Sequence, residues 1–339
     1  MSPKPLAPLP NDARVGVALC THNGSRFIAA QIKSILSQTY PISEIVVGDD
    51  DSGDNTLAII ENLVENYNQA HPKRQVKLDV RRHKPALGVR RNFSDALSAT
   101  TAEVVLLCDQ DDEWDSQKVE TLLAGLNSAN LVHTDAVLID AEGAGLGKTL
   151  FGELRVTRWE AESLAGGNAF EVLLRRNLIT GATVAMRGDF ARKNLPVEPG
   201  LLHDEWFAMM AALDGTLRLL PAAGRLTRYR QHGSNQIGAK RMGLRDRWEQ
   251  LTAGSTADNQ RRLTRAQSLL RAAEERHLGT PGQRHDLALS LQHQRVRSTL
   301  PRLRLARLPD IAREATRGHY RRYSRGWLTM VRDFLTRSN

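Results

Sequence analysis

Acidic segments follow two short apolar runs in this chain. Residues 109–113 come directly after the apolar run 104–108, and Asp49–Asp51 follow the apolar run 45–47. Short apolar runs of this kind are typical of buried strands in a parallel sheet. Because open α/β sheets bind ligands at the carboxyl ends of their strands, we expect both acidic segments at that edge.

The spacing of Asp109 and Asp111 predicts a site for one hard cation. Two carboxylates separated by one residue can share a Mg²⁺ or Mn²⁺ ion, which prefers oxygen ligands. A second interpretation is an acidic loop before a helix, with Asp112 or Asp115 as the N-terminal cap. The rest of the chain favours the cation site.

The acids at 49–51 and the polar loop Thr21–Gly24 are candidates for nucleoside binding. Adjacent carboxylates repel each other unless donors or cations satisfy them, and a nucleoside offers ribose hydroxyls and base N–H groups. Thr21–Gly24 follows the apolar run 15–20 and should reach the same sheet edge. The loop lacks the glycines of a phosphate loop or a dinucleotide fingerprint. Capping of the next helix by Asp54 is compatible with a nucleoside contact by Asp50.

Four segments, in their order and spacing, resemble family 2 glycosyltransferases of the GT-A fold. They are Cys20–Gly24, Asp49–Thr56, Leu87–Phe93 and Asp109–Trp114. The resemblance is closest to the bacterial branch that includes rhamnosyltransferases of cell-surface polysaccharide assembly. It covers about residues 14–239.

The resemblance implies roles for particular residues. It assigns nucleotide binding to Thr21, Asn23, Asp50 and Asp109, and metal binding to Asp109 and Asp111 as an Asp-x-Asp motif. Two features differ from relatives. The family often has glycine where Asp51 stands, a position that favours positive φ. The Gln-x-x-Arg-Trp signature of processive synthases is absent, which favours transfer of a single sugar.

The segment 202–206 supplies a candidate general base. An alcohol is a poor nucleophile at neutral pH, so a carboxylate close to its proton is the usual solution in single-displacement transfer. Asp204 stands at the position of the family's acidic base, although it could also cap a helix. Gly181 and Trp206 are expected near the sugar and the acceptor.

The segment 229–235 offers groups for the departing diphosphate. Negative charge grows on the diphosphate as the glycosidic bond breaks, so a cation there lowers the barrier selectively. Arg230 is expected to pair with phosphate and His232 to complete the metal shell.

The order of elements predicts an α/β fold, with a mostly parallel sheet flanked by helices on both faces. Strands are expected at 15–20, 44–47, 76–80, 104–108, 131–139 and 182–186, with a final pair at 217–220 and 225–229. Helices are expected at 25–38, 55–67, 89–99, 116–126, 159–174 and 205–213, and a loop at 143–152. The two cysteines, Cys20 and Cys108, are expected to be free thiols.

The charge distribution divides the chain. From residue 240 onward there are about 22 Lys and Arg against 9 Asp and Glu, which leaves 25 against 29 before it. We therefore expect a proline-containing leader at 1–13, a GT-A glycosyltransferase domain at 14–239 and a basic helical region at 240–339. The helix expected at 325–337 gathers apolar residues on one side with arginines beside them.

The basic region has three interpretations: docking to an anionic membrane surface, packing against the catalytic domain or a second subunit, and nucleic-acid binding. We expect no nucleic acid, because it gives no reason for acidic clusters at two strand ends. The sequence lacks an apolar membrane span or a secretory signal, so we expect a cytoplasmic location, with peripheral attachment to the inner face of the cell membrane as the alternative to a free protein.

The sequence thus predicts a metal-dependent, inverting transfer of one sugar, with rhamnose as first choice. The donor would be a nucleoside diphosphate sugar and the acceptor a hydroxyl of a glycan or lipid-linked glycan. A sugar-phosphate nucleotidylyltransferase shares the sheet architecture, but would carry a glycine-rich, arginine-containing loop after the first strand. A non-enzymatic nucleic-acid-binding protein using the basic region is the other alternative.

Overall fold

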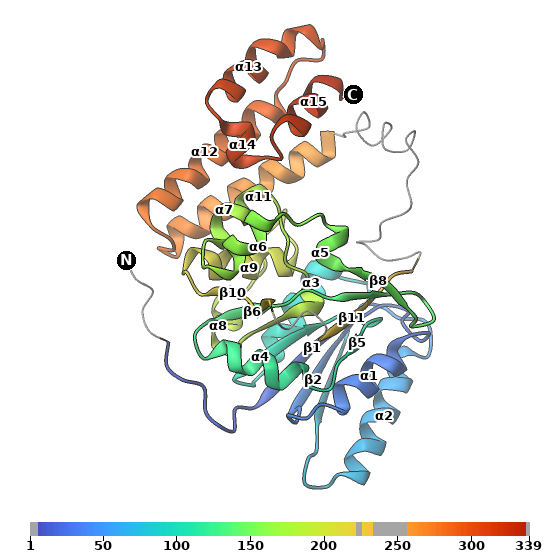
Figure 1. Ribbon diagram of the computed structural model, residues 1–339. Coiled ribbons are helices and arrows are strands. Elements are labelled where there is room, and N and C mark those ends of the chain that lie inside the picture. Colours follow the sequence, from blue (N-terminus) through green and yellow to red (C-terminus); the bar gives the residue numbers. More distant parts are fainter. Residues whose placement is uncertain (1–5, 222–225, 233–255, 337–339) are drawn as a thin grey trace.

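The computed structural model describes residues 6–221, 226–232 and 256–336. Its centre is a seven-stranded sheet with strand order β10-β6-β9-β4-β1-β2-β3 (Figure 1). Neighbouring strands are parallel, except that β9 runs antiparallel to β4 and β6. The strands are β1 (Val15–Thr21), β2 (Glu44–Asp49), β3 (Lys77–Arg82), β4 (Val104–Cys108), β6 (Leu131–His133), β9 (Val184–Arg187) and β10 (Leu217–Leu219).

Helices cover both faces of this sheet, which confirms the predicted α/β class. Along β4, Val105 and Leu107 join the core on one face, while Leu106 joins the core on the other. This alternation follows from the two-residue period of a strand. The first face is covered by α3 (Val89–Ala99), α7 (Ala169–Arg175), α8 (Gly188–Lys193) and α9 (His203–Leu213), and the second by α1 (Ile28–Leu36), α2 (Thr56–Ala70) and α4 (Lys118–Leu126).

A second, four-stranded sheet lies beside the first, with order β5-β11-β7-β8. Its strands are β5 (Glu113–Trp114), β7 (Val137–Ile139), β8 (Gly145–Thr149) and β11 (Thr227–Arg230). The predicted strand 131–139 is therefore wrong as one element, because β6 and β7 belong to different sheets. The Asp135 carboxylate accepts the backbone N–H groups of Ala136 and Phe151, each at 2.8 Å. These bonds hold the loop between β6 and β7 in place.

Other sequence-based boundaries also need correction. The predicted final strand pair is wrong, because β10 and β11 lie in separate sheets. The predicted helix 159–174 is two helices, α6 (Arg158–Ala165) and α7, separated at Gly166 and Gly167, where Gly167 has φ of 86°. The expected loop 143–152 contains β8 and α5 (Leu150–Glu153), and a 3-10 turn, η1 (Gly181–Thr183), precedes β9. Both cysteines are free thiols, as expected.

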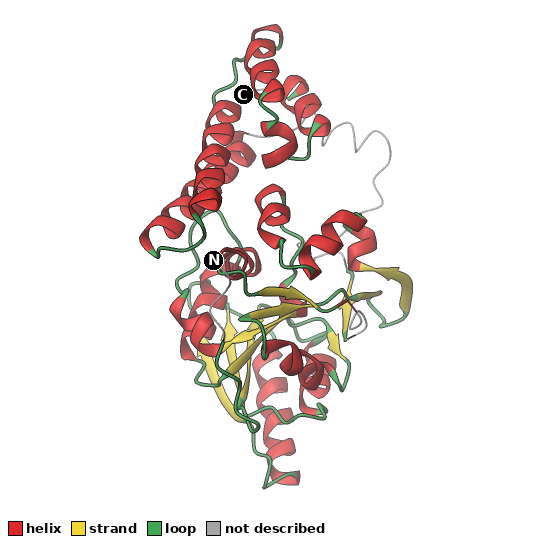
Figure 2. Ribbon diagram, turned by 60° about the vertical axis from the view of Figure 1, so that its left-hand side comes forward, coloured by secondary structure: helices red, strands yellow, loops and turns green. Residues whose placement is uncertain are grey.

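A helical region follows the sheets and lies to one side of them (Figure 2). It comprises α11 (Thr256–Glu275), α12 (Pro281–Ser298), η3 (Leu305–Arg307), α13 (Leu308–Thr316), α14 (His319–Tyr323) and α15 (Trp327–Leu335). Leu269 and Ala273 of α11 are buried in the same core as Phe207 of α9. Arg265 pairs with Glu205 at 2.6 Å. The expected division at residue 240, and residues 1–5 of the expected leader, lie outside the described residues.

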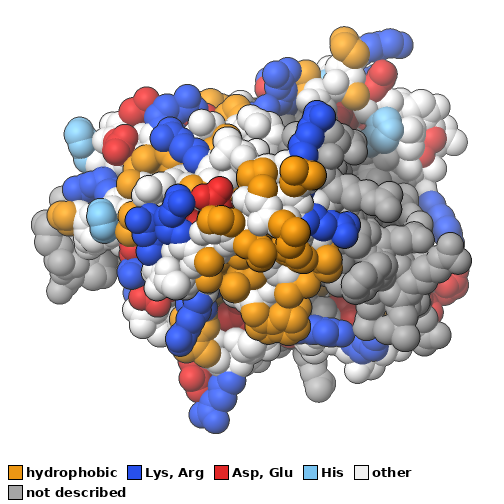
Figure 3. All heavy atoms as spheres, turned by 90° about the horizontal axis from the view of Figure 1, so that it is seen from above, with side chains coloured by type: hydrophobic (Ala, Val, Ile, Leu, Met, Phe, Trp, Pro, Cys, Tyr) orange, Lys and Arg blue, Asp and Glu red, His pale blue; other side chains and the backbone are white. Residues whose placement is uncertain are grey.

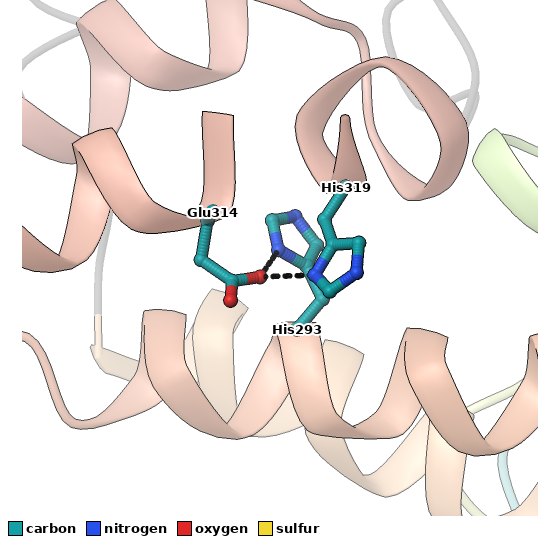
Figure 4. Close-up of side chains that lie close together, drawn as sticks. All are labelled: His293, Glu314 and His319. Atoms are coloured by element: carbon teal, nitrogen blue, oxygen red, sulfur yellow. Dashed lines mark hydrogen bonds and ion pairs between the residues drawn. The ribbon is translucent and has the colours of Figure 1, made fainter. Parts of the chain in front are cut away.

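Buried polar contacts join α12, α13 and α14. The Nδ1 atoms of His293 and His319 lie 2.6 Å and 2.9 Å from the same Glu314 carboxylate oxygen (Figure 4). The Nε2 atom of His293 lies 3.0 Å from the Ser324 hydroxyl oxygen. Both ring nitrogens of His293 and one of His319 thus have hydrogen-bond partners inside the helical region. Across 6–221, 226–232 and 256–336, no helix combines the length and apolarity needed to cross a bilayer.

Candidate functional site

A cavity of about 200 Å³ opens at the carboxyl ends of β1, β2 and β4. Thr21 of β1 is in register with Asp49 of β2, and Leu19 with Cys108 of β4, so the loops after these strands meet. Six of the residues expected at the site line this cavity: Thr21, Asp50, Asp109, Asp111, Gly181 and Asp204. The structure therefore brings together acids from three separate segments of the chain.

The β1 and β2 side of the cavity is fixed by hydrogen bonds from carboxylates. The Thr21 hydroxyl donates to Asp49 at 2.8 Å. The Asp50 carboxylate accepts the backbone N–H groups of Leu87 and Gly88, at 2.5 Å and 2.8 Å, and so holds the start of α3. Gly88 has φ of 80°, which a residue with a Cβ rarely adopts. Each Asp50 oxygen retains acceptor capacity toward a ligand.

The Asp51 position adopts the conformation that a glycine would favour. Its φ is 65°, in the left-handed region that Asp tolerates better than most residues. The departure from the family pattern therefore leaves the expected turn in place. The neighbouring Ser52 N–H donates to the other oxygen of Asp49 at 3.0 Å, which closes the turn.

The acids after β4 lie close together with little solvent. Burial raises the pKa of Asp109 to about 7, with the charges of Asp111 and Asp204 as further causes. Burial also raises the pKa of Asp112 well above its usual range. Lys118 is buried beneath them and donates to the Ala182 carbonyl at 2.6 Å. Burial lowers the pKa of this lysine to about 7.

Acids held this close together could share a divalent cation. Carboxylate charges that raise the free energy of the site by repelling each other would be offset by bound positive charge. His232 lies beside them, with its Nε2 atom 2.7 Å from Asp111 Oδ2. Carboxylate oxygens are the donors that suit Mn²⁺ or Mg²⁺. Asp109, Asp111 and His232 are the residues that would hold the ion.

Asp204 also lines the cavity, from the first turn of α9. Its carboxylate accepts the Glu205 N–H at 2.6 Å. Only 4% of the residue is exposed, and burial raises its pKa to about 7. A carboxyl group with such a pKa can accept a proton from an alcohol near neutral pH.

The structure does not support the predicted phosphate contact of Arg230. Its side chain is only 4% exposed, and its guanidinium is paired with Glu113. It also donates to the carbonyls of Asp111, Asp140 and Ala141, at 2.8, 3.1 and 3.0 Å. Arg230 therefore holds the acidic loop in place instead of facing the cavity. Sequence could not reveal this, because the partners come from two other segments.

Asn23 and Trp206 also lie elsewhere than expected. The Asn23 backbone N–H donates to the Ser52 hydroxyl at 2.9 Å and its side-chain carbonyl accepts the Gly53 N–H at 2.8 Å, so it joins two loops. Trp206 is fully buried in the core, and its indole N–H donates to the Asn194 carbonyl at 2.7 Å. Neither residue lines the cavity.

His203 and Phe93 are among the cavity residues that sequence reasoning did not assign to the site. His203 stacks on Phe93, with 3.7 Å between ring centroids, and only 5% of His203 is exposed. Within the described parts of the chain, neither ring nitrogen of His203 has a hydrogen-bond partner. Burial lowers its pKa to about 3, so the imidazole is neutral. A Cβ on Gly181 would lie 2.8 Å from His203 Nε2, so a glycine is needed there. In the sequence, the position of His203 next to the candidate base Asp204 was the sign that could have pointed to it.

Comparison with known proteins finds similarity to glycosyltransferases. The family model described as Glycosyl transferase family 2 matches residues 16–172. An uncharacterised glycosyltransferase from Nostoc sp. is 27% identical over 237 residues, which span 66% of each chain. The dTDP-rhamnosyl transferase RfbG of Shigella flexneri is 26% identical over 250 residues, 68% of this chain and 80% of that protein.

A solved structure shares the fold over nearly the whole chain. Residues 1–349 of S. aureus TarS, in complex with UDP-GlcNAc, align with a TM-score of 0.51 and 17% identity. The alignment covers 95% of this chain and 90% of that one. At this identity the likeness concerns the fold alone.

Proposed function

We propose that this chain, which matches the family model of glycosyl transferase family 2 over residues 16–172, is a glycosyltransferase that moves one sugar from a nucleoside diphosphate sugar to a hydroxyl of a glycan or lipid-linked glycan. The observation that carries the proposal is the meeting of Asp50, Asp109 and Asp204 around one cavity. These acids come from segments far apart in sequence, and a purely structural cluster of buried acids would be costly.

The donor we propose is a deoxythymidine diphosphate sugar carrying rhamnose. Similarity to the dTDP-rhamnosyl transferase of Shigella flexneri supports this choice. A hexose on a uridine diphosphate is the second candidate. It is supported by an Escherichia coli relative named as a UDP-Glc glucosyltransferase, which is 29% identical over 122 residues.

Asp204 is proposed as the general base of a single displacement. The acceptor oxygen would attack the anomeric carbon as Asp204 takes the hydroxyl proton, and the bond from that carbon to the diphosphate oxygen would break. The configuration at the anomeric carbon would invert, since one base and no covalent nucleophile is assigned. Burial in the cavity wall keeps the carboxyl group basic enough for this task.

A bound Mn²⁺ or Mg²⁺ ion would supply positive charge to the diphosphate leaving group. In the proposed site, Asp109 and Asp111 offer carboxylate oxygens, and His232 beside Asp111 offers an imidazole nitrogen. Arg230 contributes by holding the loop of Asp111 in position.

The Asp204→Asn variant tests the proposal. We expect turnover to fall at least about 100-fold, because the amide cannot accept the proton. Calorimetry should show donor binding within about twofold of wild type. With donor and metal ion saturating, the wild-type rate should rise with pH through about 7, where Asp204 loses its proton, and the variant should lack this rise. Glu205→Gln is the matched control, because Glu205 faces Arg265. Normal turnover in the Asn variant would falsify the assignment.

We further propose that the acceptor is lipid-linked and that the protein works at the inner face of the membrane. The Escherichia coli relative is named for a diphosphoundecaprenol-linked acceptor, and the relative from Campylobacter jejuni likewise. Such acceptors lie at a bilayer, so the enzyme must reach its surface. A homodimer through the helical region is the alternative use of the basic residues.

A further inference from the structure

The far end of the helical region carries an exposed apolar surface. Leu303, Leu305 and Trp327 are 77%, 76% and 68% exposed. Leu308, Leu328 and Val331 add to them, at 46%, 46% and 40%. Exposed large apolar groups clustered together mark interaction sites in water-exposed proteins. Figure 3, which views the molecule from this end, shows hydrophobic side chains gathered together with Lys and Arg around them.

Arg307 joins the two segments that bear these residues into one surface. It is 2% exposed, and its guanidinium donates to the Asp333 and Thr336 carbonyls at 2.9 Å and 2.6 Å. It also donates to the Pro301 carbonyl at 2.6 Å. The stretch 301–308 is thereby tied to the C-terminal end of α15. Within α15, Asp333 is fixed in turn by Arg297 at 2.7 Å.

The charge around this surface is strongly positive. Residues 300–336 contain nine arginines and three acidic residues. Two of the three acids, Glu314 and Asp333, are buried. The third, Asp310, already pairs with Arg313 at 3.2 Å. Arg322 and Arg332 pair with Asp286 of α12 and Asp258 of α11, so the exposed positive charge beside the apolar residues is that of arginines such as Arg302 and Arg304.

We propose that the surface formed by 303–308 and α15 docks onto an anionic lipid bilayer. Apolar side chains bordered by arginines suit the boundary between acyl chains and negative headgroups. A second copy fits less well, because it would bring the same positive charge to the contact. The inference deepens the proposed function by placing the enzyme beside a lipid-linked acceptor, but it holds whatever the donor.

A vesicle flotation experiment with the full chain tests this surface. Wild type should float with phosphatidylcholine vesicles that contain phosphatidylglycerol, and added salt should weaken binding. The triple variant Leu303→Ser, Leu305→Ser, Trp327→Ser should bind at least about tenfold more weakly. The variant should fold, since all three side chains are exposed. Leu146→Ser on β8, where Leu146 is 41% exposed, is the control that should bind like wild type.

Two results would overturn the proposal. One is a triple variant that floats as well as wild type. The other is a wild-type dimer, seen by sedimentation without vesicle binding, that becomes a monomer in the triple variant. Transfer to a water-soluble acceptor should be unchanged in the triple variant. If wild type bound vesicles but did not transfer sugar to the soluble acceptor, the proposed reaction would be refuted. The proposal of a docking surface would not be affected.

Discussion

At the scale of residues, the cavity is defined by groups that are buried without full compensation. Asp109 and Asp204 both have pKa values raised to about 7, and each lies within electrostatic reach of the other. His203 is neutral, stacks on Phe93 and finds no hydrogen-bond partner for either ring nitrogen among the described residues. Burying such groups costs free energy, and a ligand that brings hydrogen-bond donors and positive charge offsets this cost. This pattern separates the site from the structural acid Asp49, whose oxygens are satisfied.

We expect His203 to bind a sugar hydroxyl. The His203→Leu variant should lower kcat/KM by about 10- to 100-fold, because a buried sugar hydroxyl would lose its partner. The same change should leave the melting temperature of the ligand-free protein unchanged or higher, because an unpaired buried polar group is removed. His203→Gln keeps a donor and an acceptor and should recover part of the activity. Unchanged kcat/KM in the leucine variant would show that His203 is a packing residue.

The acids of the site could be predicted from sequence because they stand directly after strands. A strand end fixes where the next two or three residues lie, so Asp50, Asp109 and Asp111 reached the expected edge. Arg230 could not be predicted in the same way. Its partners come from residues 111–113 and 140–141, and only the second sheet brings these segments together. The orientation of Trp206 depends likewise on the packing of α9 into the core.

At the scale of elements, local pattern located β4 and α3 with their observed bounds, since both have clear apolar periodicity. Pattern failed where the chain passes between sheets. The run 131–139 is apolar at both ends but polar at His133, Thr134 and Asp135, and these three residues were the available sign of the break between β6 and β7. The break between α6 and α7 was better signalled, by the paired glycines 166 and 167.

The contacts among α12, α13 and α14 should make stability depend on pH. Burial lowers the pKa of His293 to about 4, below its ordinary value near 6.5. A lowered pKa means that the neutral imidazole stabilises the fold above about pH 6.5, and this contribution is lost as pH falls toward 4. The pKa of Glu314 is also lowered, despite its burial, mainly through hydrogen bonds from His293 and His319.

Urea unfolding of the His293→Gln variant measures this dependence. At about pH 7 we expect it to be less stable than wild type by roughly 1–3 kcal/mol, because the contacts with Glu314 and Ser324 are impaired. The difference should shrink as the pH is lowered to about 4, because only wild type loses the contribution of a neutral histidine. Arg295→Gln, on the same helix, is a surface control. A difference that stays constant with pH would contradict the assigned protonation state.

At the scale of the whole molecule, the chain is less divided than its charge suggests. The basic composition after residue 240 predicted a separate region, yet α11 and the start of α12 complete the core beneath α7 and α9. Leu269, Leu278 and Leu287 are buried there. Composition could not show this, because the apolar residues of α11 are spaced among many charged ones. Within the described part of the helical region, the large exposed apolar side chains lie in the stretch 303–308 and in α15.

Truncation distinguishes the two parts of the basic region. A chain ending at Gly238 should lose cooperative thermal unfolding, because removing three buried leucines costs on the order of 5 kcal/mol, comparable to the stability of a whole domain. A chain ending at Thr299 keeps α11 and α12, so it should still unfold cooperatively and bind donor, but no longer float with anionic vesicles. Calorimetric melting and circular dichroism report the first difference and flotation the second. If the chain ending at Gly238 melted like wild type, α11 would be an appendage and not a part of the catalytic fold.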